Sequence, residues 1–205
     1  MTDEFTPHVA LHPIVVAAGE VAEVLKGVES VNPVFMSTPD KAEALQALAR
    51  VEGQLVELRL RVLATADDVA AETASRDVGS WLAWHTRTRI EDARADQALA
   101  DAVDRRYAHL GAALREGIAN PAQAVVIARG LDALPAETGP EIRDLAETTL
   151  IGYCADHGPR TLARLAARIL HHIAPDVADE AEARRLAALE ADAARSTRLT
   201  LRRLG

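Results

Sequence analysis

The sequence predicts an all-α protein: a multi-helix bundle with one long N-terminal helix and a compact helix-turn-helix-like cluster. Three observations support this fold class. Alanine and leucine carry most of the apolar content, and both residues favour helices. Apolar residues recur at spacings of three and four along the chain. Helix start and stop signals recur as well, whereas strand patterns are nearly absent.

The composition is that of a globular chain, with 205 residues of which 49% are hydrophobic and 26% charged. No apolar run approaches the roughly 18 residues that a membrane span needs. Acidic Asp3 and Glu4 stand where a secretory signal would be basic. We therefore expect a cytoplasmic protein with no membrane partner. The single cysteine, Cys154, excludes an internal disulfide and a cysteine-cluster zinc site.

The N-terminal part contains two expected helices, the first at residues 14–28. The sequence STPD at residues 37–40 then offers a hydroxyl N-cap, an early proline and an early acid. The helix that it opens is expected to run to about Thr73. These features divide residues 1–37, an N-terminal helix and loop, from a helical domain at 38–196.

Apolar residues inside this long helix alternate spacings of three and four, which is a heptad pattern. Two interpretations stay open. The heptad seam can lie across the helix's own domain, or it can join two copies of the chain or a partner protein. The candidate seam residues are Leu48, Val51, Leu55, Leu58, Val62 and Val69, with Thr65 interrupting the pattern.

Residues 76–134 contain four short expected helices with tight connections. Asp77 is placed to cap the first helix and Thr88 the second. Gly117 can close the third in the left-handed conformation, and Asn120 followed by proline opens the fourth. Helix-turn-helix units are one member of this class of compact helical clusters.

The C-terminal part continues with a helix at 140–156 and an amphipathic stripe at 162–173. A polar, acidic helix follows at 175–194. Residues 197–203 alternate leucines with polar residues, which is a strand pattern without a following partner strand. We therefore assign 197–205 as a basic tail and the start of a truncated strand.

The turn after the first helix of the cluster carries the candidate DNA contacts. In a helix-turn-helix unit, arginines at this place bind phosphates or guanine. Trp81 and Trp84, three residues apart on one side of the preceding helix, are expected core anchors. Glu91, Asp92 and Asp96 can instead neutralise the arginines on a solvated face. The candidate DNA contacts are Arg76, Arg87, Arg89 and Arg94, with Arg198, Arg202 and Arg203 of the tail.

No motif predicts an active site, so we expect no catalytic residue, no metal and no cofactor. His171 and His172 are adjacent and point about 100° apart on a helix, which rarely suits one metal ion. Cys154 lies beside an apolar stripe, where a small buried side chain is expected. A hydrolytic enzyme that uses His157, His171 or Cys154 is the least favoured interpretation.

The stretch SWLAWHTRTRIEDARADQAL contains Trp-Leu-Ala, then Thr-Arg, then Ala-Arg before a leucine. LREGIANPAQAVVIARGLDALP, residues 114–135, is the most specific segment. With these motifs, over roughly residues 44–203, the chain resembles the actinobacterial 13E12 repeat family, also described as domain of unknown function 222. Members of that family commonly continue into a C-terminal HNH nuclease domain with metal-binding histidines.

The resemblance implies association with DNA-processing proteins. This chain holds no HNH-like histidine cluster, so the expected function is a non-catalytic helical module that serves a partner nuclease domain and contacts DNA weakly. The net charge of −8 agrees with weak rather than strong DNA binding. The alternative is a protein-interaction or homodimerisation module that uses the long helix and binds no nucleic acid.

Overall fold

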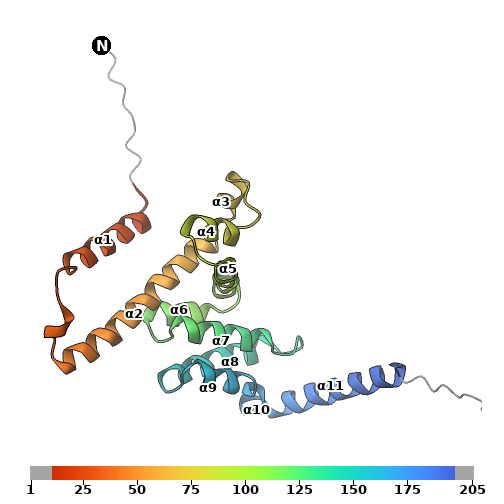
Figure 1. The fold of residues 1–205 in the computed structure, drawn as a ribbon. Coiled ribbons are helices and arrows are strands. Elements are labelled where there is room, and N and C mark those ends of the chain that lie inside the picture. Colours follow the sequence, from red (N-terminus) through yellow and green to blue (C-terminus); the bar gives the residue numbers. More distant parts are fainter. Residues whose placement is uncertain (1–10, 197–205) are drawn as a thin grey trace, which may run out of the picture. The chain divides into compact units, whose positions relative to one another are not determined.

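The computed structural model describes residues 11–196, and helices are the only regular elements in that range (Figure 1). The expected all-α class is therefore confirmed. The chain divides into two compact units, Met1–Leu45 and Gln46–Gly205, and each is described by itself.

The first unit contains α1, Pro13–Gly27, and the short 3-10 helix η1, Pro33–Phe35. It also holds the start of α2, Thr38–Leu63, which continues into the second unit. The expected hydroxyl cap opens α2, because Ser37 Oγ accepts a hydrogen bond from the Asp40 amide at 3.2 Å. The expected helix at the N-terminus is confirmed, and α1 buries none of its residues.

Helix α2 is shorter than the sequence predicts, because it ends at Leu63 rather than near Thr73. Its 26 residues span about 39 Å at 1.5 Å per residue. The cause lies at Thr65, where the pattern is interrupted. Its amide and its hydroxyl both donate to the Val62 carbonyl, at 3.2 and 3.1 Å, which closes the helix in a tight turn. A separate short helix, α3, follows at Asp67–Glu72.

The face of α2 that packs on the core is not the heptad seam. Its buried residues are Gly53, Glu57, Leu60 and Leu63. Each residue advances by about 100° around a helix, so the seam positions lie on the opposite side. Helix α2 does lie across its own domain, as one interpretation expected, but the seam takes no part in that packing. Leu48, Val51, Leu55 and Val62 are exposed, and Leu58 and Val69 are partly buried.

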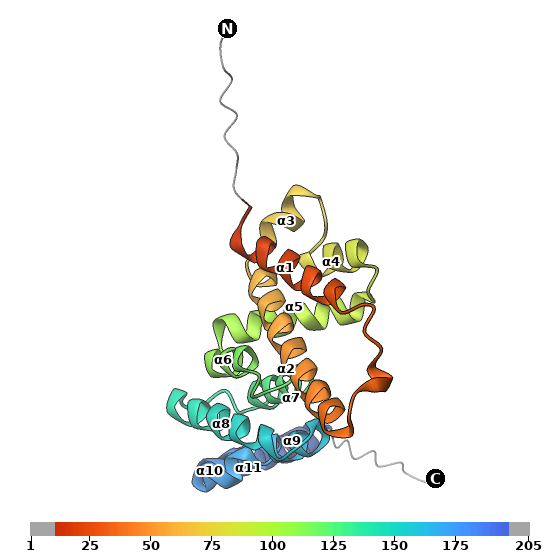
Figure 2. The same cartoon turned by 90° about the vertical axis from the view of Figure 1, so that its left-hand side faces the viewer.

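The four expected helices of the compact cluster are confirmed. They are α4 (Val78–Thr86), α5 (Ile90–Arg105), α6 (Ala108–Glu116) and α7 (Pro121–Asp132). Helix α5 contacts α4, α6 and α7, so it is the central element of the cluster (Figure 2).

Three of the expected helix ends of the cluster are confirmed. Asp77 Oδ1 accepts a hydrogen bond from the Ser80 amide at 2.6 Å and so caps α4. Gly117 closes α6 with a φ of 72°, a conformation that suits glycine. Asn120 and Gln123 form a reciprocal capping box at the start of α7, with both hydrogen bonds at 2.9 Å.

The expected cap of α5 is wrong. The N-cap residue is Arg89, and it makes no side-chain capping bond. Thr88 is one residue too early, and its hydroxyl lies 2.9 Å from the hydroxyl of Thr86 instead. The Thr86 hydroxyl in turn donates to the Leu82 carbonyl at 2.7 Å, so both threonines belong to the end of α4.

The C-terminal part has more breaks than the sequence predicts. The expected helix at 140–156 is α8, Pro140–Gly152, followed by a 3-10 turn, η2, at Tyr153–Ala155. The expected stripe at 162–173 is split between α9, Pro159–Ala166, and α10, Ile169–Ile173. The last described helix, α11, spans Pro175–Ser196.

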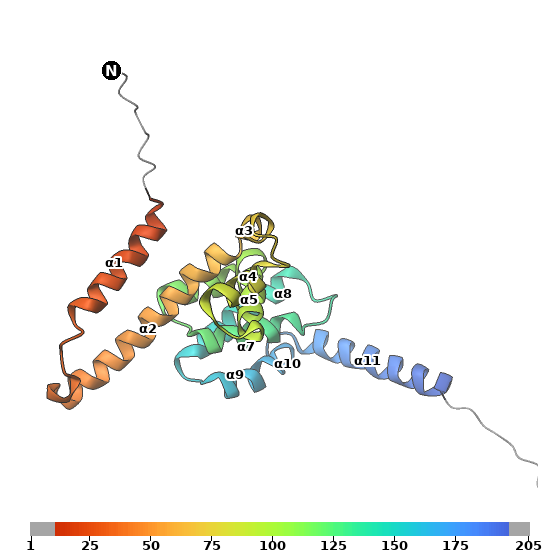
Figure 3. The ribbon, with the colours of Figure 1, turned by 45° about the horizontal axis from the view of Figure 1, so that its top comes forward.

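The core of the second unit is formed by residues of α2 and of α4 to α10, and Figure 3 shows α7 between α5 and α9. Small residues allow close approach there. A Cβ on Gly130 of α7 would lie 2.5 Å from the Cβ of Ala166 of α9, so only glycine fits. The largest fully buried side chains are Leu60, Val78, Leu110, Leu114, Ile127, Leu131, Leu150, Leu162 and Ile169.

Candidate interaction surfaces

The turn between α4 and α5 presents an exposed cation–aromatic stack. Arg87 ends α4 in the left-handed region, with a φ of 59°, which is unusual for a residue other than glycine. Its guanidinium carbon lies 4.9 Å from the ring centre of Trp84, a distance typical of cation–π contacts. The backbone of Arg87 therefore folds its side chain back over an aromatic ring.

The expectation that both tryptophans anchor the core is wrong for Trp84, whose relative exposure is 68%. Trp81 is partly buried, and its ring stacks on His85 at a centroid distance of 4.3 Å. The spacing of three residues separates the two rings by about 60° around the helix, so one turns inward while the other reaches the rim. The indole N–H of Trp81 is buried and has no hydrogen-bond partner among the described residues.

The candidate arginines of this corner are all exposed, and acids lie close to three of them. Arg89 Nε lies 3.7 Å from a Glu91 oxygen, and Arg94 Nη2 lies 3.8 Å from an Asp77 oxygen. Hydrogen bonds from Ser80 lower the pKa of Asp77, and the positive charges of Arg94 and Arg76 lower it further. The corner therefore carries nearly balanced charge.

A pocket behind this turn contributes negative charge to the corner. Asp92 and Asp96 line it, together with Thr86, Thr88 and Arg59. Arg59 Nη2 pairs with Asp96 Oδ2 at 2.8 Å, which leaves Asp92 as a negative charge beside the arginines. Arg198, Arg202 and Arg203, with the strand pattern at 197–203, lie outside the described residues.

The second candidate surface is the α2 seam, by which we mean Leu48, Val51, Leu55, Leu58 and Val62. Four of its five side chains are exposed, from 59% for Leu48 to 40% for Leu55. Exposed Glu52 and Arg59, seven residues apart, flank the seam on one side. An apolar stripe of this length with a charged border is typical of helices that bind another helix.

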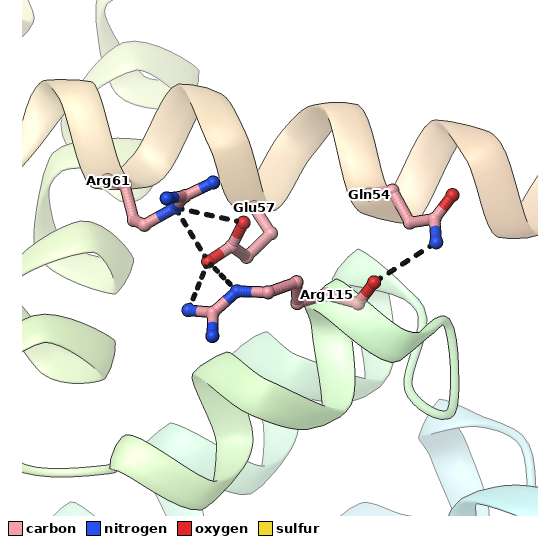
Figure 4. A network of polar contacts seen from close by, with 4 residues as sticks. All are labelled: Gln54, Glu57, Arg61 and Arg115. Carbon is pink, nitrogen blue, oxygen red and sulfur yellow. Dashed lines mark hydrogen bonds and ion pairs between the residues drawn. The ribbon is translucent and has the colours of Figure 1, made fainter. Parts of the chain in front are cut away.

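A buried carboxylate fixes α2 on α6 and so fixes the direction in which the seam points (Figure 4). The Glu57 side chain is only 3% exposed, and its Oε1 lies 2.8 Å from Arg115 Nη2 and 3.0 Å from Arg61 Nε. The Gln54 amide adds a bond by donating to the Arg115 carbonyl at 3.1 Å. Sequence reasoning missed this network, although the i, i+4 spacing of Glu57 and Arg61 was a visible signal.

A second buried carboxylate, also missed from the sequence, caps α6. Glu147 Oε1 accepts a hydrogen bond from the Leu110 amide at 2.7 Å. This bond serves a helix start that has no side-chain cap of its own. Desolvation by burial raises the pKa of Glu147, although the backbone bond opposes that shift.

Two of the histidines considered for chemistry contact the ring of Tyr153, with centroid distances of 6.0 Å to His157 and 6.4 Å to His172. Cys154 is buried as expected, and burial raises the pKa of its thiol to about 11. His171 and His172 are exposed near one end of α10. The part of the chain that the structure describes contains no group of three or more His, Cys, Asp or Glu side chains that could hold a metal ion. Among the described helices, none is long and apolar enough to cross a membrane.

Comparison with known proteins identifies one family. The family described as "Domain of unknown function (DUF222)" has a model that matches residues 40–201, which is most of the chain. No curated protein and no solved structure matches the sequence.

Proposed function

The chain belongs to the DUF222 family, and from that membership we propose that its helical domain is a non-catalytic module that binds another protein through the α2 seam. The observation that carries the proposal is the exposure of the seam on the side of α2 opposite the core. The seam side chains repeat in heptads but do not contribute to the core of the domain. Apolar side chains in this pattern are stabilised when a second apolar surface covers them.

The size of the seam favours a reversible complex. Fully burying a Val or Leu side chain stabilises by about 1.5–3 kcal/mol, and these side chains are roughly half exposed, so each offers about 1 kcal/mol. A matching apolar face on the partner contributes a similar amount. Association itself costs about 4–15 kcal/mol. The free energy gained from burying both faces exceeds that cost only when the cost lies in the lower part of this range.

The resemblance to the 13E12 repeat proteins supplies the expected context. We propose that the module works beside DNA-processing proteins of the HNH nuclease type in an actinobacterial cytoplasm, positioning them rather than cutting DNA itself. Cys154 does not supply a catalytic nucleophile in this proposal, because a buried thiol with a raised pKa is a poor nucleophile.

Photo-crosslinking in the source organism tests the proposed function. A benzophenone amino acid replaces Leu48, and the matched control places it at Leu186, an exposed leucine of α11. We expect one defined protein adduct from Leu48 and none from Leu186, with the adduct lost when Leu55→Lys is added. Without an adduct from Leu48, the seam is not a docking surface.

A second candidate function, weak DNA contact, is favoured by one specific observation. Trp84 and Arg87 form an exposed stack beside Arg89, and a stacked guanidinium keeps its donors free for phosphate. Glu91 and Asp92 oppose this contact by repelling phosphate. The salt dependence of DNA binding tests this contact.

A further inference from the structure

We propose that the occupant of the α2 seam is a second copy of this chain, with the two α2 helices antiparallel. The inference rests on the proposed function, since it names the partner of that same surface. It is supported by the spacing of the apolar side chains and by the two charges that border them.

The spacing of the seam side chains allows the seam of one copy to pack against the same seam of a second copy. Leu48, Leu55 and Val62 are each seven residues apart, and Val51 and Leu58 fall between them. This alternation of three and four residues allows side chains of one helix to fit between those of another. The seam spans about 21 Å along the helix axis, and in a pair related by a two-fold axis the segments from Val51 to Val62 cover each other.

The charges select the direction. Glu52 and Arg59 lie on the same flank of the seam, one heptad apart. In an antiparallel pair this flank faces the same flank of the second copy, so Glu52 meets Arg59 of the second copy, and the contact occurs twice. In this register Val51 packs beside Val62 of the second copy, and Leu55 packs beside Leu58.

A parallel pair gains no such contact. The flank with Glu52 and Arg59 would then face the opposite flank of the second copy, which holds Ala47, Gln54 and Arg61. In a parallel pair Glu52 would lie beside Ala47 and Arg59 beside Gln54, so neither would form an ion pair, and Arg61 lies too far along the axis to reach Glu52. In the antiparallel pair Arg59 can keep its bond to Asp96, because a guanidinium has five donors.

Sedimentation of the purified full chain at several concentrations tests self-association. The mass is expected to rise from 21.9 kDa toward twice that value as the concentration increases. Leu55→Lys should weaken the dimer by at least about tenfold, because a charge would enter the seam. The matched control, Leu186→Lys on α11, should leave the dimer unchanged, and circular dichroism checks that both variants fold. A monomer up to about 1 mM overturns the inference.

Disulfide cross-linking tests the direction. Cys154 is buried, so an introduced cysteine is the accessible one among the described residues. A mixture of Val51→Cys and Val62→Cys chains should link readily, whereas Val51→Cys alone should not, since the two sulfurs would lie about 16 Å apart along the axis. Leu48→Cys alone links only in a parallel pair, and that result overturns the antiparallel arrangement.

The outcomes separate this inference from the proposed function. A chain that stays monomeric but forms an adduct with a different protein from Leu48 keeps the docking module and overturns the second copy. A chain that is monomeric and forms no adduct overturns both.

Discussion

Glu57 and Arg115 join two helices across 58 residues of sequence, with Arg115 Nε and Nη2 donating to Glu57 Oε1 at 3.1 and 2.8 Å (Figure 4). The carboxylate is buried while the guanidinium is half exposed, so the arginine compensates a charge that has left water. This contact holds α2 on α6 through the face opposite the seam.

Arg115→Ala should therefore destabilise the protein more than Arg61→Ala does. Loss of Arg115 removes the bond between helices and leaves Glu57 with Arg61 alone, at a cost of about 1–3 kcal/mol. Arg61 bonds Glu57 within α2, and its removal should cost less than about 1 kcal/mol. Urea unfolding of the two variants gives the comparison. Equal losses would mean that the bond between helices contributes nothing beyond local pairing.

Gly130→Ala should destabilise the contact of α7 with α9, because the added Cβ would lie 2.5 Å from the Cβ of Ala166. Overpacking of this kind costs about 1–3 kcal/mol. Ala166→Gly in the same chain should restore part of the loss. The control is Gly152→Ala, where a Cβ meets nothing within 4 Å. Thermal unfolding measures all three variants, and an unchanged midpoint for Gly130→Ala would contradict the close packing.

Glu147→Gln should gain stability relative to the wild type as the pH rises. Burial raises the folded-state pKa of Glu147 above its ordinary value of 4.5, so the folded state binds more protons than the unfolded state between the two values. Wild-type stability therefore falls as pH rises from about 4.5 through the folded pKa, and glutamine, which cannot ionise, removes that loss. Unfolding free energies at pH 4 and pH 7 give the difference. A difference that does not change with pH would show that the carboxyl titrates normally.

Arg87→Ala and Arg89→Ala should each weaken DNA binding and reduce the slope of log affinity against log salt by about one, if each arginine neutralises one phosphate. The matched control is Arg185→Ala, an exposed arginine of α11 that pairs with Glu182 at 3.0 Å. Fluorescence anisotropy of labelled duplex DNA measures the affinity. Absence of binding at low salt, or the same slope in all variants, would remove DNA contact as a function.

Local signals predicted most of the fold. The caps at Asp77, Gly117 and Asn120 lie where the sequence placed them, because each depends on a side chain and its next few amides. The break of α2 at Thr65 was visible only as an imperfection in the heptads. Thr65 ends the helix through the two hydrogen bonds that its amide and its hydroxyl donate to the Val62 carbonyl. A pattern of apolar residues does not reveal such bonds.

Contacts between distant residues were not predictable in the same way. Glu147 caps α6 from α8, and nothing in the sequence near Leu110 indicates a partner 37 residues away. The inward or outward direction of Trp81 and Trp84 was equally hidden, because two rings on one side of a short helix can still lie on different sides of the core boundary. The seam was predicted only in part, because Val69 lies in α3, beyond the end of α2. The face of α2 that packs on the core could not be predicted from the apolar pattern alone.

The separation of the two faces of α2 also matters for how such proteins diverge. Gly53, Glu57, Leu60 and Leu63 secure folding, and no seam side chain is among them. Substitutions at the exposed seam positions Leu48, Val51, Leu55 and Val62 can therefore accumulate with little effect on the stability of the single chain. A lineage can exchange one binding partner for another on this helix while the architecture beneath it is preserved.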